Sequence, residues 1–291
     1  MTDSGAPWDG RGLPPVAAAR VAQAASSGVA SSLLSAPAAA SLAGCGLVPV
    51  GEVMGAIVQH IGSVGYGCSY GARTISSGSG SRWAGLSPYV DAVQRGWNTA
   101  LSRLLQEATA LGADGVVGVR LTRERLGLSS DYEFLALGTA VVGRGRVHAE
   151  RPFLTDLDGQ DVAKLLHGGW VPTGIAIGVA AAVRHDDYGT RRQASSWGNV
   201  EVGGYTDLVT QVRDDARTQF HRRAVAIGGE AATVSDMTLD VWEYEPSDNH
   251  RDHYASATVT GTVAARFHRG RSAPTDSLTI LSLNRTQEGR R

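Results

Sequence analysis

The feature that most constrains the fold is a helix that stops at a glycine and leads directly into a strand. Residues 87–119 read S-P-Y-V-D-A-V-Q-R-G-W-N-T-A-L-S-R-L-L-Q-E-A-T-A-L-G-A-D-G-V-V-G-V. Apolar side chains recur along the helical part at steps of three and four residues, which predicts one buried face: Val90, Val93, Trp97, Leu101, Leu104, Ala108 and Leu111. Ser87 is expected to cap the helix, with Pro88 in its first turn. Gly112 is expected to end it in the left-handed conformation.

A strand is predicted directly after this helix, beginning at Gly115. Three apolar side chains alternate along it and would share one side of a sheet: Val117, Val119 and Leu121. Asp114 marks the junction, and the glycine at Gly118 favours close approach by a neighbouring element. A second strand over residues 132–142, which contains Gly138, is expected to complete an antiparallel hairpin.

A second, diverged copy of this pattern follows roughly 120 residues later, and such internal repeats indicate how a chain is built. Residues 46–55 read G-L-V-P-V-G-E-V-M-G, and residues 169–178 read G-W-V-P-T-G-I-A-I-G. Both fit the pattern G-x-V-P-x-G-x-x-x-G, which indicates a strand interrupted by glycines. Pro49 favours an edge position, or the start of the strand, for the first of them.

The helix and the strands after it also recur. A helix is predicted over residues 205–227, and its end, A-I-G-G-E, matches A-L-G-A-D in the first copy, so Gly228 corresponds to Gly112. In the last strand T-V-T-G-T-V-A matches L-A-L-G-T-A-V, so Gly261 corresponds to Gly138. The predicted fold class is therefore α+β, with two tandem β-α-β-β units that have short lead-in helices.

This repeat divides the chain into four predicted segments. They are a flexible and alanine-rich helical segment (1–43), a first unit (44–148), a second unit (149–268) and a flexible basic tail (269–291). The lead-in helices are expected at residues 35–43 and 155–166.

Composition excludes several classes of function. The chain has 291 residues and a formal net charge of −1, which argues against a general nucleic-acid binder. Its two cysteines make no disulfide framework and fit a reducing cytoplasm, where we expect the protein to reside. The apolar run over residues 169–183 spans about 15 residues, short of the roughly 20 that a membrane helix needs. We therefore expect no membrane segment.

The two motifs of the first copy resemble those of a known family. A-L-G-A-D-G-V-V-G-V at residues 110–119, followed by L-G-T-A-V-V at residues 137–142, resembles the YbjQ-like family, often labelled heavy-metal-binding. The resemblance covers residues 46–143 well. It covers residues 169–266 more loosely, because G-G-E-A-A-T-V at residues 228–234 departs from G-A-D-x-V-V-G.

This resemblance implies a small β-α-β-β subunit with dodecin-like topology that assembles as a five-membered ring. A chain with two such copies would supply the surface of two adjacent subunits. The family label also suggests a divalent or transition metal as a cofactor. The shared motif itself marks a helix–strand junction rather than an active site.

Two groups of side chains are candidate metal ligands. The segment D-N-H-R-D-H offers His250, Asp252 and His253, and the segment H-D-D offers His185 and Asp187. A solvated hairpin turn is the favoured interpretation of the first group, because its ligand count falls short of a closed site. No Cys/His cluster in the sequence has zinc-site spacing.

Other reactive patterns are weaker still. Cys68 and His60 would form a thiolate–imidazole pair only if the fold brought them together. The glycine-rich loop from Gly62 to Gly85 invites comparison with a phosphate loop, but no helix opens directly after its glycines. Asp214 and Asp215 suggest a solvated, ion-paired helix face.

These observations rank three functions. The first is a non-enzymatic oligomeric binding or scaffold protein with no catalytic residues, forming a homo-oligomeric ring without nucleic-acid or membrane partners. The second is a metal-binding or metal-responsive protein. The third is a hydrolase or transferase that uses the Gly62–Gly85 loop.

Overall fold

The computed structural model describes residues 8, 10, 12–27, 30–62, 74–77, 86–127, 130–145, 148, 150–247 and 250–267. The elements in chain order are α1 (Pro15–Ser26), α2 (Ala36–Gly44), β1 (Leu47–His60), β2 (Thr74–Ser76), α3 (Ser87–Ala110), β3 (Gly115–Arg125), β4 (Asp131–Gly143), β5 (Phe153–Leu154), α4 (Gly159–His167), β6 (Trp170–His185), α5 (Tyr188–Ala194), α6 (Gly203–Ala226), β7 (Ala231–Ser247) and β8 (His250–Arg266).

The strands form two four-stranded sheets. Sheet A has the order β1-β4-β3-β5, and sheet B has the order β2-β6-β8-β7. Neighbouring strands are antiparallel except β3 and β5, which are parallel. The mixture of helices with two sheets confirms the predicted α+β class. The strand that contains Pro49 lies at the edge of its sheet, and β3 and β4 form the expected hairpin.

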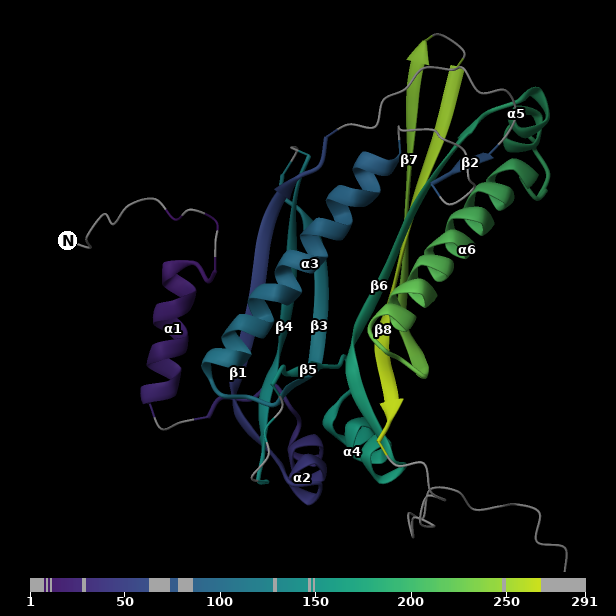
Figure 1. Ribbon diagram of the computed structural model, residues 1–291. Coiled ribbons are helices and arrows are strands. Elements are labelled where there is room, and N and C mark those ends of the chain that lie inside the picture. Colours follow the sequence, from purple (N-terminus) through teal and green to yellow (C-terminus); the bar gives the residue numbers. More distant parts are fainter. Residues whose placement is uncertain are drawn as a thin grey trace, which may run out of the picture.

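Helix α3 lies between the two sheets. On one side Gly55 of β1 meets the helix so closely that a Cβ atom there would overlap the Ala100 carbonyl oxygen. On the other side alternate residues of β6 join α3 in one buried cluster: Ile175, Ile177, Val179, Ala181 and Val183. Helix α6 packs on the opposite face of sheet B, where Gly178 meets Ala216. The layers therefore run sheet A, α3, sheet B and α6 (Figure 1).

The two ends of α3 show which sequence-based predictions of helix termini agree with the structure. Gly112 has φ +68°, so the expected left-handed glycine follows the helix. The prediction that Ser87 caps the helix is wrong, because the helix begins at Ser87 itself and the residue at the N-cap is Leu86. Ser35 does cap α2 and Asp158 caps α4, each by accepting backbone N–H groups. Both predicted lead-in helices are thus present.

The free edge of β1 is protected by side chains of α3. The Glu107 carboxylate is fully buried, accepts the Met54 backbone N–H at 2.7 Å, and pairs with Arg20 of α1. Arg103 donates to the Ala56 carbonyl. Such capping leaves fewer strand groups available for unwanted pairing with another sheet.

We expect Glu107→Ala to lower the free energy of unfolding by about 1–3 kcal/mol, because a buried N–H group would lose its acceptor. Urea unfolding followed by circular dichroism measures this change. Asp91→Ala, on the exposed side of α3, is the control and should leave stability nearly unchanged. Equal stability of the two variants would contradict the role assigned to Glu107.

Strand β2 joins the sheet of the other half of the chain. It comes from the connection between β1 and α3, yet it pairs with β6 through Thr74–Arg184, Ile75–Val183 and Ser76–Ala182. The Ser76 hydroxyl also donates to Asp215 of α6. The sequence predicted only the Gly62–Gly85 loop here.

The rest of the predicted Gly62–Gly85 loop, apart from Gly62 and residues 74–77, lies outside the described residues, as do Cys68 and the predicted tail (269–291). Within the described ranges, no helix has both the length and the apolar composition needed to cross a bilayer.

Candidate functional site

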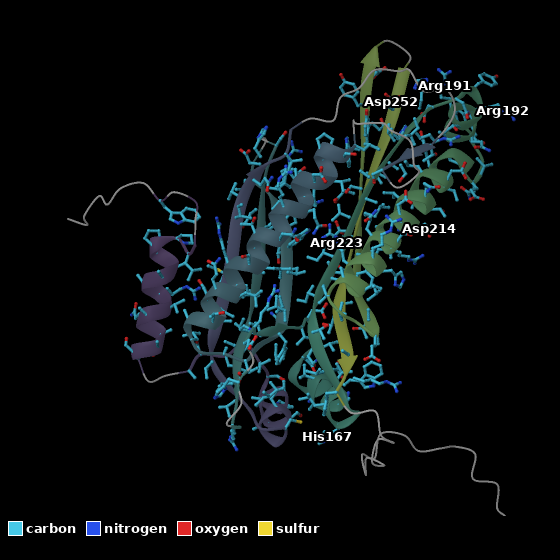
Figure 2. The ribbon with its side chains drawn as sticks, in the orientation of Figure 1. His167, Arg191, Arg192, Asp214, Arg223 and Asp252 are labelled. Carbon is cyan, nitrogen blue, oxygen red and sulfur yellow. The ribbon has the colours of Figure 1, made fainter. Side chains whose placement is uncertain are left out.

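The predicted metal ligands belong to the end of β6, the start of β8 and the N-cap of α5, and Figure 2 shows Asp252 at this end of sheet B. Asp252 and His253 are consecutive in β8, and consecutive strand residues point to opposite faces. Accordingly, Asp252 pairs with His185 (Oδ1 to Nδ1, 2.8 Å), whereas His253 lies 3.0 Å from Asp186 (Nδ1 to Oδ1). The structure therefore does not bring Asp252 and His253 to one ion. The side chain of His250 lies outside the described residues.

Asp187, the other candidate, has a structural role. Its carboxylate caps α5 by accepting the Thr190 backbone N–H at 2.6 Å, and it pairs with Arg184 at 3.2 Å. The hydrogen bond from Thr190, followed by the charge of Arg184, holds the pKa of Asp187 below its usual value although partial burial opposes the shift.

The structure reveals a hydrogen-bonded network around the buried His253 and Asp186 that the sequence did not indicate. The His253 ring lies between two carboxylates, with Nδ1 near Asp186 and Nε2 2.8 Å from Glu243. Tyr205 of α6 donates its hydroxyl to Asp186 at 3.1 Å. Burial, together with the Asp186 charge, raises the pKa of Tyr205 to about 12. These contacts connect α6 to sheet B. Their residues are far apart in the sequence, so only the three-dimensional structure shows that they meet.

Among the described residues, no three His, Cys, Asp or Glu side chains are grouped as a metal site would require. The softest pair of donors is Cys45 and His167, with Sγ and Nε2 3.6 Å apart between α2 and α4. Burial raises the pKa of the Cys45 thiol, which disfavours the thiolate that binds metals. Figure 2 places His167 at the opposite end of the molecule from Asp252.

The residues of the shared motif hold the helix–strand junction together. The Asp114 carboxylate accepts the Gly143 backbone N–H at 2.7 Å and pairs with His148 at 3.0 Å. Gly118 and Gly228 have φ of +65° and +83°, where glycine is favoured. The remaining motif glycines are in close contact with neighbours: Gly115 with Phe153, Gly138 with Val116, and Gly261 with the Thr233 carbonyl.

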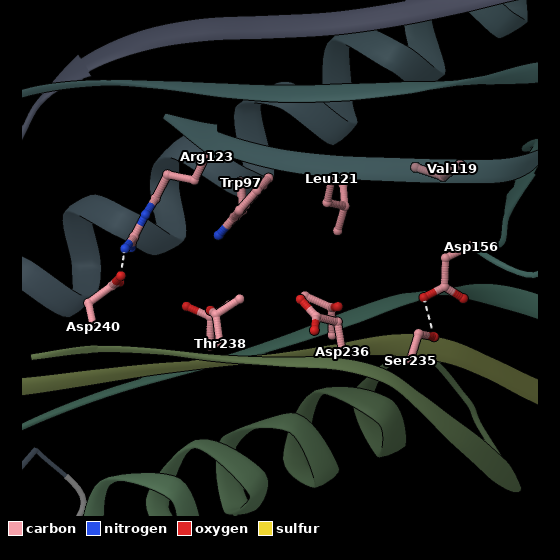
Figure 3. A pocket seen from close by; sticks show the side chains of 11 residues that line it. Trp97, Val119, Leu121, Arg123, Asp156, Ser235, Asp236, Thr238 and Asp240 are labelled. Atoms are coloured by element: carbon pink, nitrogen blue, oxygen red, sulfur yellow. Dashed lines mark hydrogen bonds and ion pairs between the residues drawn. The ribbon is translucent and has the colours of Figure 1, made fainter. Parts of the chain in front are cut away.

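A cavity of about 310 Å³ lies between sheet A and sheet B, and we term it the inter-sheet cavity. It is lined by Trp97, Val119, Leu121, Arg123, Asp156, Ser235, Asp236, Thr238, Asp240, Thr258 and Thr260. In Figure 3 the side chains of β3 and α3 face those of β7 across it, with the Arg123–Asp240 ion pair at one end and the Asp156–Ser235 hydrogen bond at the other. No pattern in the sequence indicated this cavity, because its walls come from five separate segments.

Comparisons with known proteins identify a family and several relatives that match part of this chain. The profile of the YbjQ family, described as "Putative heavy-metal-binding", matches residues 50–144. An encapsulin nanocompartment protein of Mycobacterium tuberculosis is 36% identical over 173 residues, which cover 57% of this chain and 60% of that protein. The chain thus spans less than two thirds of that relative.

Two smaller relatives are matched over most of their length. A UPF0145 protein of Halorubrum lacusprofundi is 37% identical over 79 residues, which cover 27% of this chain and 69% of the relative. A UPF0145 protein of Vibrio campbellii is 34% identical over 93 residues, which cover 31% of this chain and 80% of the relative. A comparison with solved structures finds no match.

Proposed function

Because the chain belongs to the YbjQ family of UPF0145 proteins, we propose that it is a non-enzymatic scaffold subunit that assembles head to tail with further copies of itself. One observation carries this proposal. Among the residues that the structure describes, helix α3 is covered by a sheet on both sides, whereas α6 is covered by a sheet on one side. The contact between the helix of one unit and the sheet of the other thus occurs once within the chain, and the described residues leave the two corresponding surfaces, one on sheet A and one on α6, without such a contact.

The proposal treats residues 169–266 as a diverged copy of residues 46–143. Gly55 and Gly178 support this, because each meets the backbone of the long helix that follows it, at Ala100 and Ala216 respectively. Both strands also shift register at the same place, after Pro49 and after Pro172.

The first open surface is the outer face of sheet A, formed by Met54, Ala56, Val58, Leu135 and Leu137. Counted from Gly55 and Gly178, Met54 corresponds to Ile177 and Ala56 to Val179, which are buried against α3 in sheet B. Val58 is 56% exposed, and the other four side chains are half-buried. An apolar group of this kind, with a charged rim, is typical of a protein contact surface. The rim residues are Glu52, Glu124, Asp131, Glu133, Arg120 and His60.

The second open surface is the outer side of α6, formed by Arg213, Asp214, Arg217, Thr218, His221 and Arg222, all exposed. Counted from Ala100 and Ala216, Arg213 corresponds to Trp97 and Arg217 to Leu101. At these positions α6 has cationic residues where α3 has apolar ones. The rim of sheet A, in contrast, is rich in carboxylates. The long arginine stems can cover apolar surface while their charges meet the rim.

A contact between different surfaces of identical chains is heterologous, so it closes into a ring or extends into a filament. The five-membered ring implied by the family resemblance is one closed form. The name of the Mycobacterium tuberculosis relative, an encapsulin nanocompartment protein, agrees with a role in protein assembly. We propose such a role for this chain.

The test is native mass spectrometry of the full chain with size-exclusion chromatography at low and high salt. We expect a defined multimer that dissociates between roughly 0.05 M and 1 M salt, because exposed charge pairs are screened over a few ångströms at the higher concentration. A monomer at low salt and micromolar concentration would contradict the proposal. A multimer that salt leaves intact would contradict the charge-based contact.

Metal binding is the second candidate, supported by the family description and by the Cys45–His167 pair. Two donors fall short of the four that a closed structural site provides, so the residues do not by themselves fit a resident metal. Elemental analysis of the purified protein separates the two functions. A stoichiometric metal that is lost in Cys45→Ser would favour the metal-binding function over the scaffold.

A further inference from the structure

The inter-sheet cavity contains two buried hydrogen-bond donors with no acceptor among the described residues. These donors are the indole N–H of Trp97, whose side chain is buried, and the Nη1 group of Arg123. The other terminal nitrogen of Arg123 pairs with Asp240. Buried donors without an acceptor are unfavourable, so this end of the cavity is suited to a ligand that brings oxygen acceptors.

The opposite end of the cavity offers the reverse chemistry. Asp236 lies on the same face of β7 as Thr238 and Asp240, because alternate strand residues share a face, and Figure 3 shows it below β3. Asp156 lies beyond it and accepts hydroxyl groups from Ser235 and Thr262. Two carboxylates without a cation among the lining residues at this end favour a positively charged group.

Between these two ends, the cavity has one apolar wall and one wall that carries hydroxyl groups. Val119 and Leu121 of β3 form the first, and Thr258 and Thr260 of β8 belong to the second. Asp236 and Asp240 are four positions apart along β7, which corresponds to about 13 Å of strand. A ligand that reaches both ends therefore needs a short chain of several atoms between its charged groups.

We propose that the inter-sheet cavity binds a small zwitterion, with a carboxylate at Trp97 and Arg123 and an ammonium group at Asp236 and Asp156. Its short hydrocarbon chain lies over Leu121 and Val119. This site lies within one chain, between its two sheets, so it does not depend on assembly with other copies. The ligand class is that of an amino acid whose amino group is several carbons from its carboxylate.

Isothermal titration calorimetry of the full chain with 6-aminohexanoate, hexanoate and hexylamine tests this proposal. We expect 6-aminohexanoate to bind at least tenfold more tightly than hexanoate or hexylamine, each of which carries only one charged group. No binding of 6-aminohexanoate would overturn the proposal. Equal binding of hexylamine would also overturn it, since the indole and guanidinium donors would then contribute nothing.

Two variants locate the site. Trp97→Phe keeps the aromatic contact with Phe134, whose ring lies 5.1 Å away, but removes the N–H donor, and Asp236→Asn removes the exposed carboxylate with little effect on folding. We expect each to weaken 6-aminohexanoate binding at least tenfold. Asp214→Asn, on the outer side of α6, makes the same charge change away from the cavity and should bind normally. Normal binding by both cavity variants would place the ligand elsewhere.

Discussion

Replacing either Gly55 or Gly178 by alanine is expected to lower the free energy of unfolding by about 3 kcal/mol or more. A Cβ atom at Gly55 would overlap the Ala100 carbonyl oxygen, and one at Gly178 would overlap the Ala216 carbonyl oxygen. Both obstacles are helix backbone atoms, which cannot turn aside as a flexible side chain can. The whole helix would have to move away from its sheet, and the buried contacts beside it would loosen. Urea unfolding followed by circular dichroism measures the loss.

Gly44→Ala provides the control. Gly44 ends α2, and no atom of another described element lies within 4 Å of the position that its Cβ would take. Because alanine is the better helix former, this variant should be as stable as the natural protein or slightly more so. Should the Gly55 and Gly178 variants unfold like this control, the close helix–sheet contact in both halves would be refuted. The support it gives to a diverged repeat would be lost as well.

Reversing the charge of Arg217 is expected to abolish the proposed multimer. Leu101, the residue at the corresponding place in α3, lines a cavity together with Ile175 and Ile177 of β6. Glu52 and Met54 hold the equivalent places in β1, so a docked α6 would set Arg217 opposite Glu52 of another copy. Arg217→Glu should therefore yield monomers in native mass spectrometry, because two like charges would meet in the contact.

The reciprocal change distinguishes a specific contact from general loss of binding. Glu52→Arg alone should also give monomers, whereas the double variant, Arg217→Glu with Glu52→Arg, should restore the multimer. Arg192→Glu makes the same change in net charge on α5, away from the outer side of α6 (Figure 2), and should assemble normally. If the double variant stays monomeric while each protein remains folded, Arg217 and Glu52 do not face each other.

Local elements were well predicted from the sequence. The helix that ends before Gly112 and the hairpin of β3 and β4 follow from short-range signals: a three- and four-residue period, a glycine stop and alternating apolar residues. Such signals depend on neighbours only a few positions away. For the same reason they could not show that α3 has two covered sides. Trp97 and Leu101 fit a single apolar face equally well, and the second sheet comes from distant residues.

The candidate site was predicted less well, and the reason is geometric. Asp252 and His253 are adjacent in the sequence, but the pleat of β8 turns them to opposite faces, and each finds its partner on a different strand or turn. The donors in the inter-sheet cavity were missed for the converse reason. Trp97 and Asp236 are far apart in sequence and belong to different elements. Only the packing of the two sheets brings them to one cavity.

The pairing of β2 with β6 also has a consequence for biosynthesis. Strand β2 leaves the ribosome long before its partner strand exists, since roughly 100 residues separate them and synthesis proceeds at about 5–20 residues per second. During those roughly 5–20 seconds β2 has no partner strand, so its pairing with β6 cannot form. A protein cut between β4 and β5 would likewise give two fragments that each lack a strand contact, and we expect such fragments to recover native structure only when they are combined.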